Sequence, residues 1–123
     1  MPNVLEQLEL IRKTPANWDG YGADLPKSEC VDAAIRLWQQ HTEMRNLGSP
    51  FVMPTRIGGV LFAWHAGPHQ LDIEIDSPTH GGFAYLNTET DEAMEGEFVL
   101  SGMTRLPSVL KSIMADKFTL IPA

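Results

Sequence analysis

The segment HQLDIEIDSPTH, residues 69–80, holds the side chains of this sequence with the greatest capacity for chemistry. Three carboxylates, Asp72, Glu74 and Asp76, occupy every second position, and a histidine stands at either end. Because successive side chains of a strand point to opposite faces, this spacing predicts a strand that presents one row of negative charge. Such a row could bind a metal ion, attract a basic partner, or form the solvated side of an ordinary sheet.

Metal binding is one candidate chemistry, because imidazole and carboxylate groups are common metal ligands. The candidate ligands are His65, Asp72, Asp76 and His80. The sequence lacks the helical His-x-x-x-His spacing of zinc proteases, and its single cysteine, Cys30, excludes a multi-cysteine zinc site and an internal disulfide. We expect Cys30 to be a small buried hydrophobe. We expect no bound cofactor, and a metal-dependent enzyme or metal-binding protein using these four ligands is the alternative hypothesis.

Other enzyme classes have less support. The sequence contains neither Gly-x-Ser-x-Gly nor a glycine-rich phosphate-binding loop, and Ser28 and Ser108 stand where helices are expected to begin. Carboxylates are abundant, but no deep apolar pocket is indicated that would raise the pKa of one of them. We therefore expect a protein without catalytic residues.

The distribution of charge is more informative than the net charge of −7. Residues 1–56 contain seven acids and six bases, whereas residues 57–104 contain eight acids and neither lysine nor arginine. A surface that serves only solubility usually mixes the two signs of charge. The acidic middle of the chain repels nucleic acid and anionic membranes and attracts basic surfaces, so we expect neither nucleic acid nor membrane as a direct partner.

The elements that position these residues can be predicted from periodicity. Asn3 should cap a first helix that ends before Pro15, Ser28 should cap a second that ends at Gly48, and a third should cover residues 106–114. Between the second and third helices, alternating patterns predict an antiparallel sheet of three to four strands. The prediction is a single α+β domain over residues 1–123, with two N-terminal helices, the sheet and a C-terminal helix.

The first two predicted strands, VLFAWH and QLDIEID, can be aligned as a hairpin across the four residues AGPH. This register places Trp64 opposite Leu71 and Phe62 opposite Ile73 on one face, and Ala63 opposite Asp72 on the other. Two later strands are expected in FAYLN and GEFVLSG, with residues 87–97 forming largely an acidic loop.

Residues 17–26, NWDGYGADLP, lie between the first two predicted helices and are rich in turn formers. Together with PTRIGGVLFAWH and LDIEID, this segment resembles a group of small bacterial proteins with Asn-Trp-Asp-Gly-Tyr-Gly ahead of a Gly-Gly-led strand. The resemblance covers about residues 14–87. It implies the fold and an origin in bacteria or mobile elements, and it implies no activity.

The hypothesis that follows is a cytoplasmic, non-enzymatic protein-binding module, comparable to an antitoxin, an inhibitor or an anti-defence protein. No apolar run approaches 18 residues, and the N-terminus lacks a signal-peptide pattern. Its partner would be a basic protein, with nucleic-acid-binding proteins as one candidate class, and a homodimer through exposed strand edges is an alternative. Trp18 and Tyr21 either pack into the core, which the small residues around them favour, or contact the partner. The predicted contact residues are Asp72, Glu74, Asp76, Tyr85, Trp18 and Tyr21.

Overall fold

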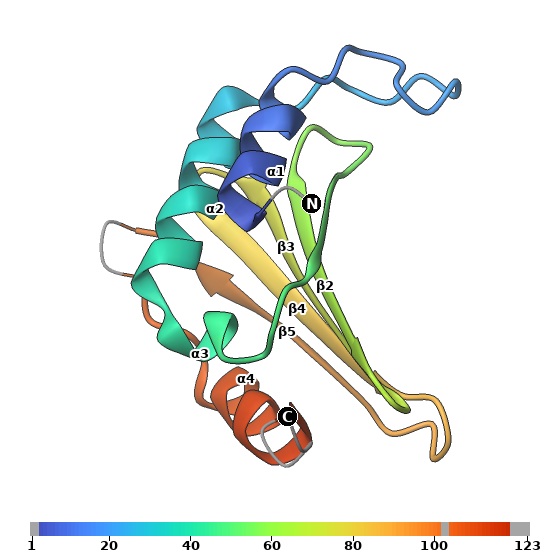
Figure 1. The fold of residues 1–123 in the computed structure, drawn as a ribbon, viewed down its shortest axis with the longest axis vertical. Helices are drawn as coiled ribbons and strands as arrows, with labels where there is room; N and C mark the ends of the chain where they lie inside the picture. The colour runs from blue at the N-terminus through green and yellow to red at the C-terminus, as the bar shows by residue number, and fades with distance from the viewer. Residues whose placement is uncertain (1–2, 102–103, 119–123) are drawn as a thin grey trace.

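A five-stranded antiparallel sheet, whose strands follow one another in sequence order, carries the helices on one of its faces (Figure 1). The computed structural model describes residues 3–101 and 104–118. The helices are α1 (Val4–Arg12), α2 (Ser28–Gln40), α3 (Thr42–Arg45) and α4 (Ser108–Ile113), and a π-helical turn (Met114–Phe118) extends α4. The strands are β1 (Phe51–Pro54), β2 (Val60–Ala66), β3 (His69–Ser77), β4 (His80–Asn87) and β5 (Ala93–Val99).

The predicted α+β class is confirmed, but the sheet has five strands where three to four were expected. The missed strand, β1, has only four residues, ends in Pro54, and leaves Phe51 and Met53 exposed. A segment this short, flanked by prolines, has no clear alternation of apolar and polar residues. The segment is recognised as a strand only by its pairing with β2 in the folded protein, because its own sequence pattern does not indicate one.

The predicted register of β2 and β3 is confirmed at each position. Trp64 lies opposite Leu71, Phe62 opposite Ile73, and Ala63 opposite Asp72. The turn is shorter than expected, because Ala66 and His69 pair and leave only Gly67 and Pro68 between the strands. A two-residue connection that contains a positive-φ glycine suits the twist of an antiparallel hairpin.

Strand β5 begins earlier than expected, at Ala93 and not at Gly96, so that Glu95 belongs to the sheet and not to a loop. Two cross-strand glycine–phenylalanine pairs explain this strand. Gly96 lies opposite Phe83, and Gly81 lies opposite Phe98. A Cβ added at either glycine would lie within 3 Å of the opposing ring, so the ring covers the glycine backbone.

The core lies between the helices and the inner face of the sheet. Alternate residues of β2 and β3, beginning with Val60 and Leu71, are fully or almost fully buried there. Trp38 of α2 stacks on Phe62, and Phe62 stacks on Trp64, with 6.0 Å between ring centroids in both pairs. The indole N–H of Trp64 donates to the carbonyl of Gly48 at 3.1 Å, so this buried polar group is satisfied.

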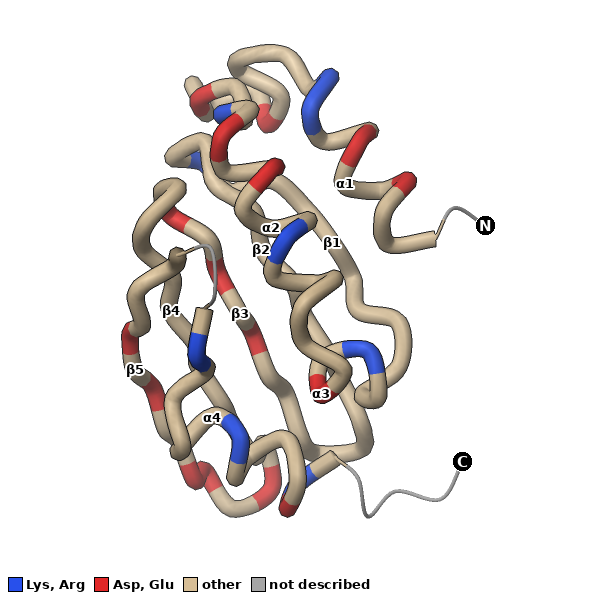
Figure 2. The backbone as a smooth tube through the Cα atoms, turned by 90° about the vertical axis from the view of Figure 1, so that its left-hand side faces the viewer, with Lys and Arg blue, Asp and Glu red and all other residues tan. Residues whose placement is uncertain are grey.

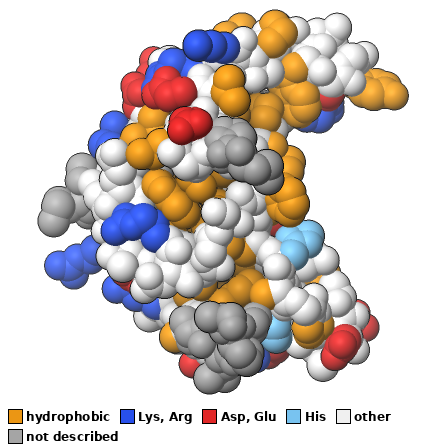
Figure 3. Space-filling model, viewed as in Figure 1, with side chains coloured by type: hydrophobic (Ala, Val, Ile, Leu, Met, Phe, Trp, Pro, Cys, Tyr) orange, Lys and Arg blue, Asp and Glu red, His pale blue; other side chains and the backbone are white. Residues whose placement is uncertain are grey.

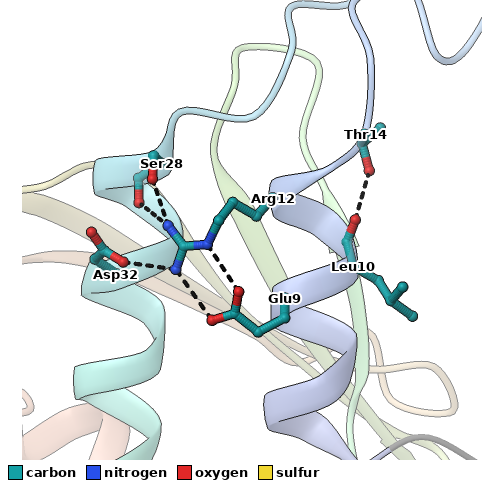
Figure 4. Close-up of polar contacts among 6 residues, drawn as sticks. All are labelled: Glu9, Leu10, Arg12, Thr14, Ser28 and Asp32. Atoms are coloured by element: carbon teal, nitrogen blue, oxygen red, sulfur yellow. Dashed lines mark hydrogen bonds and ion pairs between the residues drawn. The ribbon is translucent and has the colours of Figure 1, made fainter.

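The two N-terminal helices are joined by a side-chain network (Figure 4). The side chain of Asn3 caps α1 by accepting from the amide of Glu6, as predicted. Ser28 does not cap α2, since its hydroxyl accepts from Arg12, and the guanidinium of Arg12 also bonds Asp32 at 2.7 Å. The second helix also ends earlier than expected: extended backbone at His41 separates α2 from α3.

Gly59 provides a test of the close approach of β2 to β3. A Cβ at this position would lie 2.1 Å from the carbonyl oxygen of Ile75. We predict that Gly59→Ala lowers the free energy of unfolding by about 3 kcal/mol, measured by urea denaturation, because backbone has to move. Gly82→Ala is the matched control: its nearest contact is 3.4 Å away, so no loss is expected. Equal losses in both variants would contradict this explanation.

Candidate functional site

The outer face of the sheet carries two columns of carboxylates, one on β3 and one on β5. All described helices lie on the other face (Figures 1 and 2), and Figure 2 shows acidic residues along both strands. Between the columns, β4 presents small residues: Gly82 lies between Glu74 and Glu97, and Ala84 lies between Asp72 and Glu95. We call this surface the acidic groove; its members are Asp72, Glu74, Asp76, Gly82, Ala84, Glu95 and Glu97.

The acidic groove is a hollow of about 820 Å³, also lined by Thr55, Leu61 and His80. Because neighbouring strands lie about 4.8 Å apart, the two carboxylate columns are separated by about 10 Å. Within each column the step between side chains is about 6.6 Å. Gly82, which has no side chain, and Ala84, which has only a methyl group, leave the surface between the two carboxylate columns hollow.

Partial burial and mutual repulsion oppose ionisation in the β3 column. Burial raises the pKa of Asp72, although the nearby His65 acts in the opposite direction. Burial also raises the pKa of Glu74, and the charge of Asp76, a hydrogen bond with Asp76 and the charge of Asp72 add to the rise. The groove therefore has too little positive charge of its own to neutralise these carboxylates. A cation that enters the groove would relieve their mutual repulsion.

His80 lies between the two columns at one end of the groove. Its Nδ1 is 3.3 Å from Oδ2 of Asp76, and its Nε2 is 3.6 Å from Oε2 of Glu97. The pairing of β3 and β4 is irregular between Ile75 and Ser77, and this irregularity is adjacent to His80. The imidazole thus links the β3 column to the β5 column.

An apolar border runs along the outer face beside the acidic groove. Phe51 and Met53 of β1 lie opposite Ala63 and Leu61 of β2, and both are exposed. The ring of Phe51 makes an edge contact with His65 at 6.4 Å. The outer face therefore combines charge with exposed hydrophobic surface, as protein interfaces do.

The predicted four-ligand metal set does not converge on one point. His65 lies opposite Gln70, and Asp76 is six residues further along β3, or about 20 Å away. Of the four, Asp76 and His80 form a contact, with 3.3 Å between Oδ2 and Nδ1. Among residues 3–101 and 104–118, no group of three or more His, Cys, Asp or Glu side chains is placed to hold a metal ion.

Tyr85 was a predicted contact residue, and the structure contradicts this. It lies opposite Leu71 on the inner face and is only 1% exposed. Its hydroxyl is 2.7 Å from Nδ1 of His69, whose ring also contacts Phe118. Tyr85 is therefore a core residue, because its place in β4 gives it the same parity as the buried Phe83.

Trp18 and Tyr21 lie in the connection between α1 and α2, and the favoured prediction that they pack into the core is wrong. Tyr21 is 84% exposed and Trp18 is 36% exposed. We call this connection, residues 14–27, the projecting loop, because it extends beyond the sheet at the top of Figure 1.

Cys30 of α2 is fully buried, as expected, and burial raises the pKa of its thiol.

Hydrogen bonds fix the projecting loop. Asp19 Oδ1 accepts from the amides of Tyr21 at 2.8 Å and Ala23 at 3.2 Å, while Asp19 Oδ2 accepts from Arg56 at 2.6 Å. Arg56 also donates to the carbonyl of Tyr21 at 2.6 Å. Arg56 was not among the predicted site residues, because its two partners lie more than 30 residues away in the sequence.

No protein-family model, curated protein or solved structure matches the chain. The resemblance of residues 14–87 to small bacterial proteins therefore stays a prediction. In the described part of the chain, none of the helices is long and apolar enough to cross a membrane. The geometry of the outer face is thus the basis for a functional proposal.

Neutralising Glu74 should stabilise the protein. A carboxylate whose pKa is raised by folding destabilises the folded state when ionised, and this penalty is relieved as the pH falls through the raised pKa. We predict that Glu74→Gln raises the free energy of unfolding at pH 7 by about 0.5 to 1 kcal/mol, and that the gain disappears at a pH below the pKa of the unfolded state. Urea denaturation across pH measures this. Glu89→Gln, in the exposed β4–β5 turn, is the control and should show no gain.

Removing Asp19 should loosen the projecting loop. The amide of Tyr21, Arg56 and the amide of Ala23 hold the pKa of Asp19 below its ordinary value, with the Tyr21 bond as the largest cause. We predict that Asp19→Ala accelerates hydrogen exchange at the Tyr21 and Ala23 amides about tenfold, as observed by NMR. In the wild type the same protection should be lost as the pH falls through the lowered pKa. Asp24→Ala, in the same loop, should leave exchange unchanged; faster exchange in both variants would contradict the assignment.

Proposed function

We propose that the chain is a non-enzymatic protein-binding module that docks its acidic groove on a basic surface of a partner protein. The observation that carries the proposal is the pair of carboxylate columns flanking a floor of small residues, on a sheet face that contains neither lysine nor arginine. An antitoxin that covers a basic toxin, or an inhibitor that occupies a basic, nucleic-acid-binding groove, would present a surface of this kind.

Electrostatics supports a cationic partner. The raised pKa values of Asp72 and Glu74 mean that the ionised row is strained by desolvation and like charge. Lysine or arginine side chains from a partner would neutralise the row and form charge-assisted hydrogen bonds with it. The long-range field of the groove would also accelerate association with such a surface.

The spacing of the charges favours a partner that binds nucleic acid. The step of about 6.6 Å within a column is of the same order as the step between successive phosphates along a strand. A partner surface that aligns basic side chains with phosphates would therefore also align them with Asp72, Glu74 and Asp76. The same negative field disfavours direct binding of nucleic acid by this chain.

A homodimer through strand edges has less support. At the β5 edge, antiparallel pairing of two copies would place Glu95 and Glu97 of one copy near the same residues of the other, and like charges directly opposite one another are destabilising. At the other edge, β1 is short and ends in Pro54, which cannot donate a ladder hydrogen bond. The metal-binding alternative also has less support, since its four candidate ligands do not converge on one point and only a pair of them, Asp76 and His80, is shown in contact.

Charge reversal of the β3 column tests the proposal. A variant with Asp72→Lys, Glu74→Lys and Asp76→Lys should no longer retain the basic protein that the wild type retains from a lysate of its source cells, because attraction becomes repulsion. The matched control is Glu29→Lys, Glu89→Lys and Asp116→Lys, which reverses the same number of charges at exposed positions elsewhere. Circular dichroism shows that both variants are folded.

The control variant should retain the same basic protein as the wild type. Binding of the purified partner should also weaken steeply between about 50 and 200 mM salt, because salt screens contacts between charged surfaces. If the β3-column variant retains the same proteins as the control, or if the wild type retains no basic protein, the proposed function is wrong.

A further inference from the structure

The acidic groove does not account for the projecting loop, which exposes large hydrophobic side chains. Tyr21 is 84% exposed, Leu25 is 57% exposed, and Ile57 of the adjoining β1–β2 connection is 53% exposed. Exposed hydrophobic residues that are scattered singly need no explanation, but these belong to two segments that are bonded to each other. The amide of Asp24 donates to the carbonyl of Arg56, and the amide of Lys27 donates to the carbonyl of Gly58.

The projecting loop is held in an unusual backbone conformation. Asn17, Gly20 and Gly22 have positive φ angles of 58°, 78° and 82°. A Cβ at either glycine would meet nothing within 4 Å, so glycine is required there by the backbone angle and not by lack of space. Together with the bonds of Asp19 and Arg56, these residues hold Tyr21 outward in one arrangement, which lowers the entropy lost when a partner binds.

The projecting loop is continuous with the acidic groove. Thr55 lines the groove, and the next residue, Arg56, bonds the side chain of Asp19 and the carbonyl of Tyr21. Figures 1 and 2 together show that the loop extends toward the side of the sheet opposite the helices. Figure 3 shows a hollowed flank below the overhanging loop, with hydrophobic side chains on the overhang.

We infer that the projecting loop is a second contact for the same basic partner, with Tyr21 as an anchor that enters an apolar pocket beside the partner's cationic surface. This inference rests on the proposed function. A preorganised tyrosine offers a large contact area with only two side-chain torsions to fix, and tyrosine is enriched among the residues that dominate binding energy. The charged groove attracts and orients the partner, and the tyrosine adds affinity that salt does not screen.

Site-specific photo-crosslinking tests whether one partner contacts both surfaces. The photoreactive residue p-benzoylphenylalanine replaces Tyr21 in one variant, Leu86 in a second and Leu10 in a third, each expressed in the source cells. Leu86 is exposed on the outer face beside the groove, and Leu10 is 58% exposed on α1. We expect positions 21 and 86 to crosslink to the same basic polypeptide, identified by mass spectrometry, and position 10 to yield no such product.

The outcomes separate this inference from the proposed function. A basic protein crosslinked at position 86 but not at position 21 would overturn the inference and leave the proposed function standing. Different proteins at the two positions, or a crosslinked second copy of the chain at position 21, would also overturn the inference. Absence of a basic protein at both positions would overturn both proposals.

Affinity measurements with the identified partner, purified, give an independent readout. Tyr21→Ala should weaken binding by at least about tenfold while leaving its salt dependence unchanged. The β3-column charge reversal should weaken binding and reduce the salt dependence. Val109→Ala, a truncation of an exposed hydrophobe on α4, is the control and should bind as the wild type does. Equal affinities of wild type and Tyr21→Ala would overturn the inference.

Discussion

The pairing of β2 with β3 is the constraint on which the other features of the molecule depend. Because side chains alternate along a strand, one register places Phe62 and Ile73 in the core and turns Asp72 and Glu74 to the outside. A shift by one residue would bury the carboxylates and expose the hydrophobic side chains. The helices cover only the face that this register makes apolar, and the acidic face is left uncovered by the described helices.

Two parts of the structure hold arrangements that folding alone does not favour. In the β3 column, partial burial raises the pKa values of Asp72 and Glu74, so the folded state is less stable than it would be with neutral residues there. In the projecting loop, a positive φ at Asn17 and a largely exposed Tyr21 are maintained by a network centred on Asp19 and Arg56. Local exceptions of this kind concentrate at functional sites, and here they lie on connected surfaces.

The parts of the fold that were predicted correctly are those governed by short-range pattern. Alternation was sufficient for the β2–β3 register, and the preference of asparagine for the N-cap position was sufficient for the cap at Asn3. Strand β1 was missed because four residues carry too short a pattern, and the start of β5 was misplaced because its acids resemble a loop. Tyr85 was placed on the wrong face because the sequence indicated no register between β3 and β4; its pairing with Leu71 puts it on the inner face.

By itself, the sequence determined the α+β class, the hairpin register, the acidic row and its lack of neighbouring cations. These properties depend on residues close together in the chain, where strand and helix periodicity act directly. Only the tertiary structure decided that Glu95 and Glu97 face the β3 column across Gly82 and Ala84, that His65 and His80 are apart, and that Arg56 holds the loop bearing Tyr21. These relations join residues separated by an intervening strand or by more than 30 positions, and the sequence carries no local signal for them.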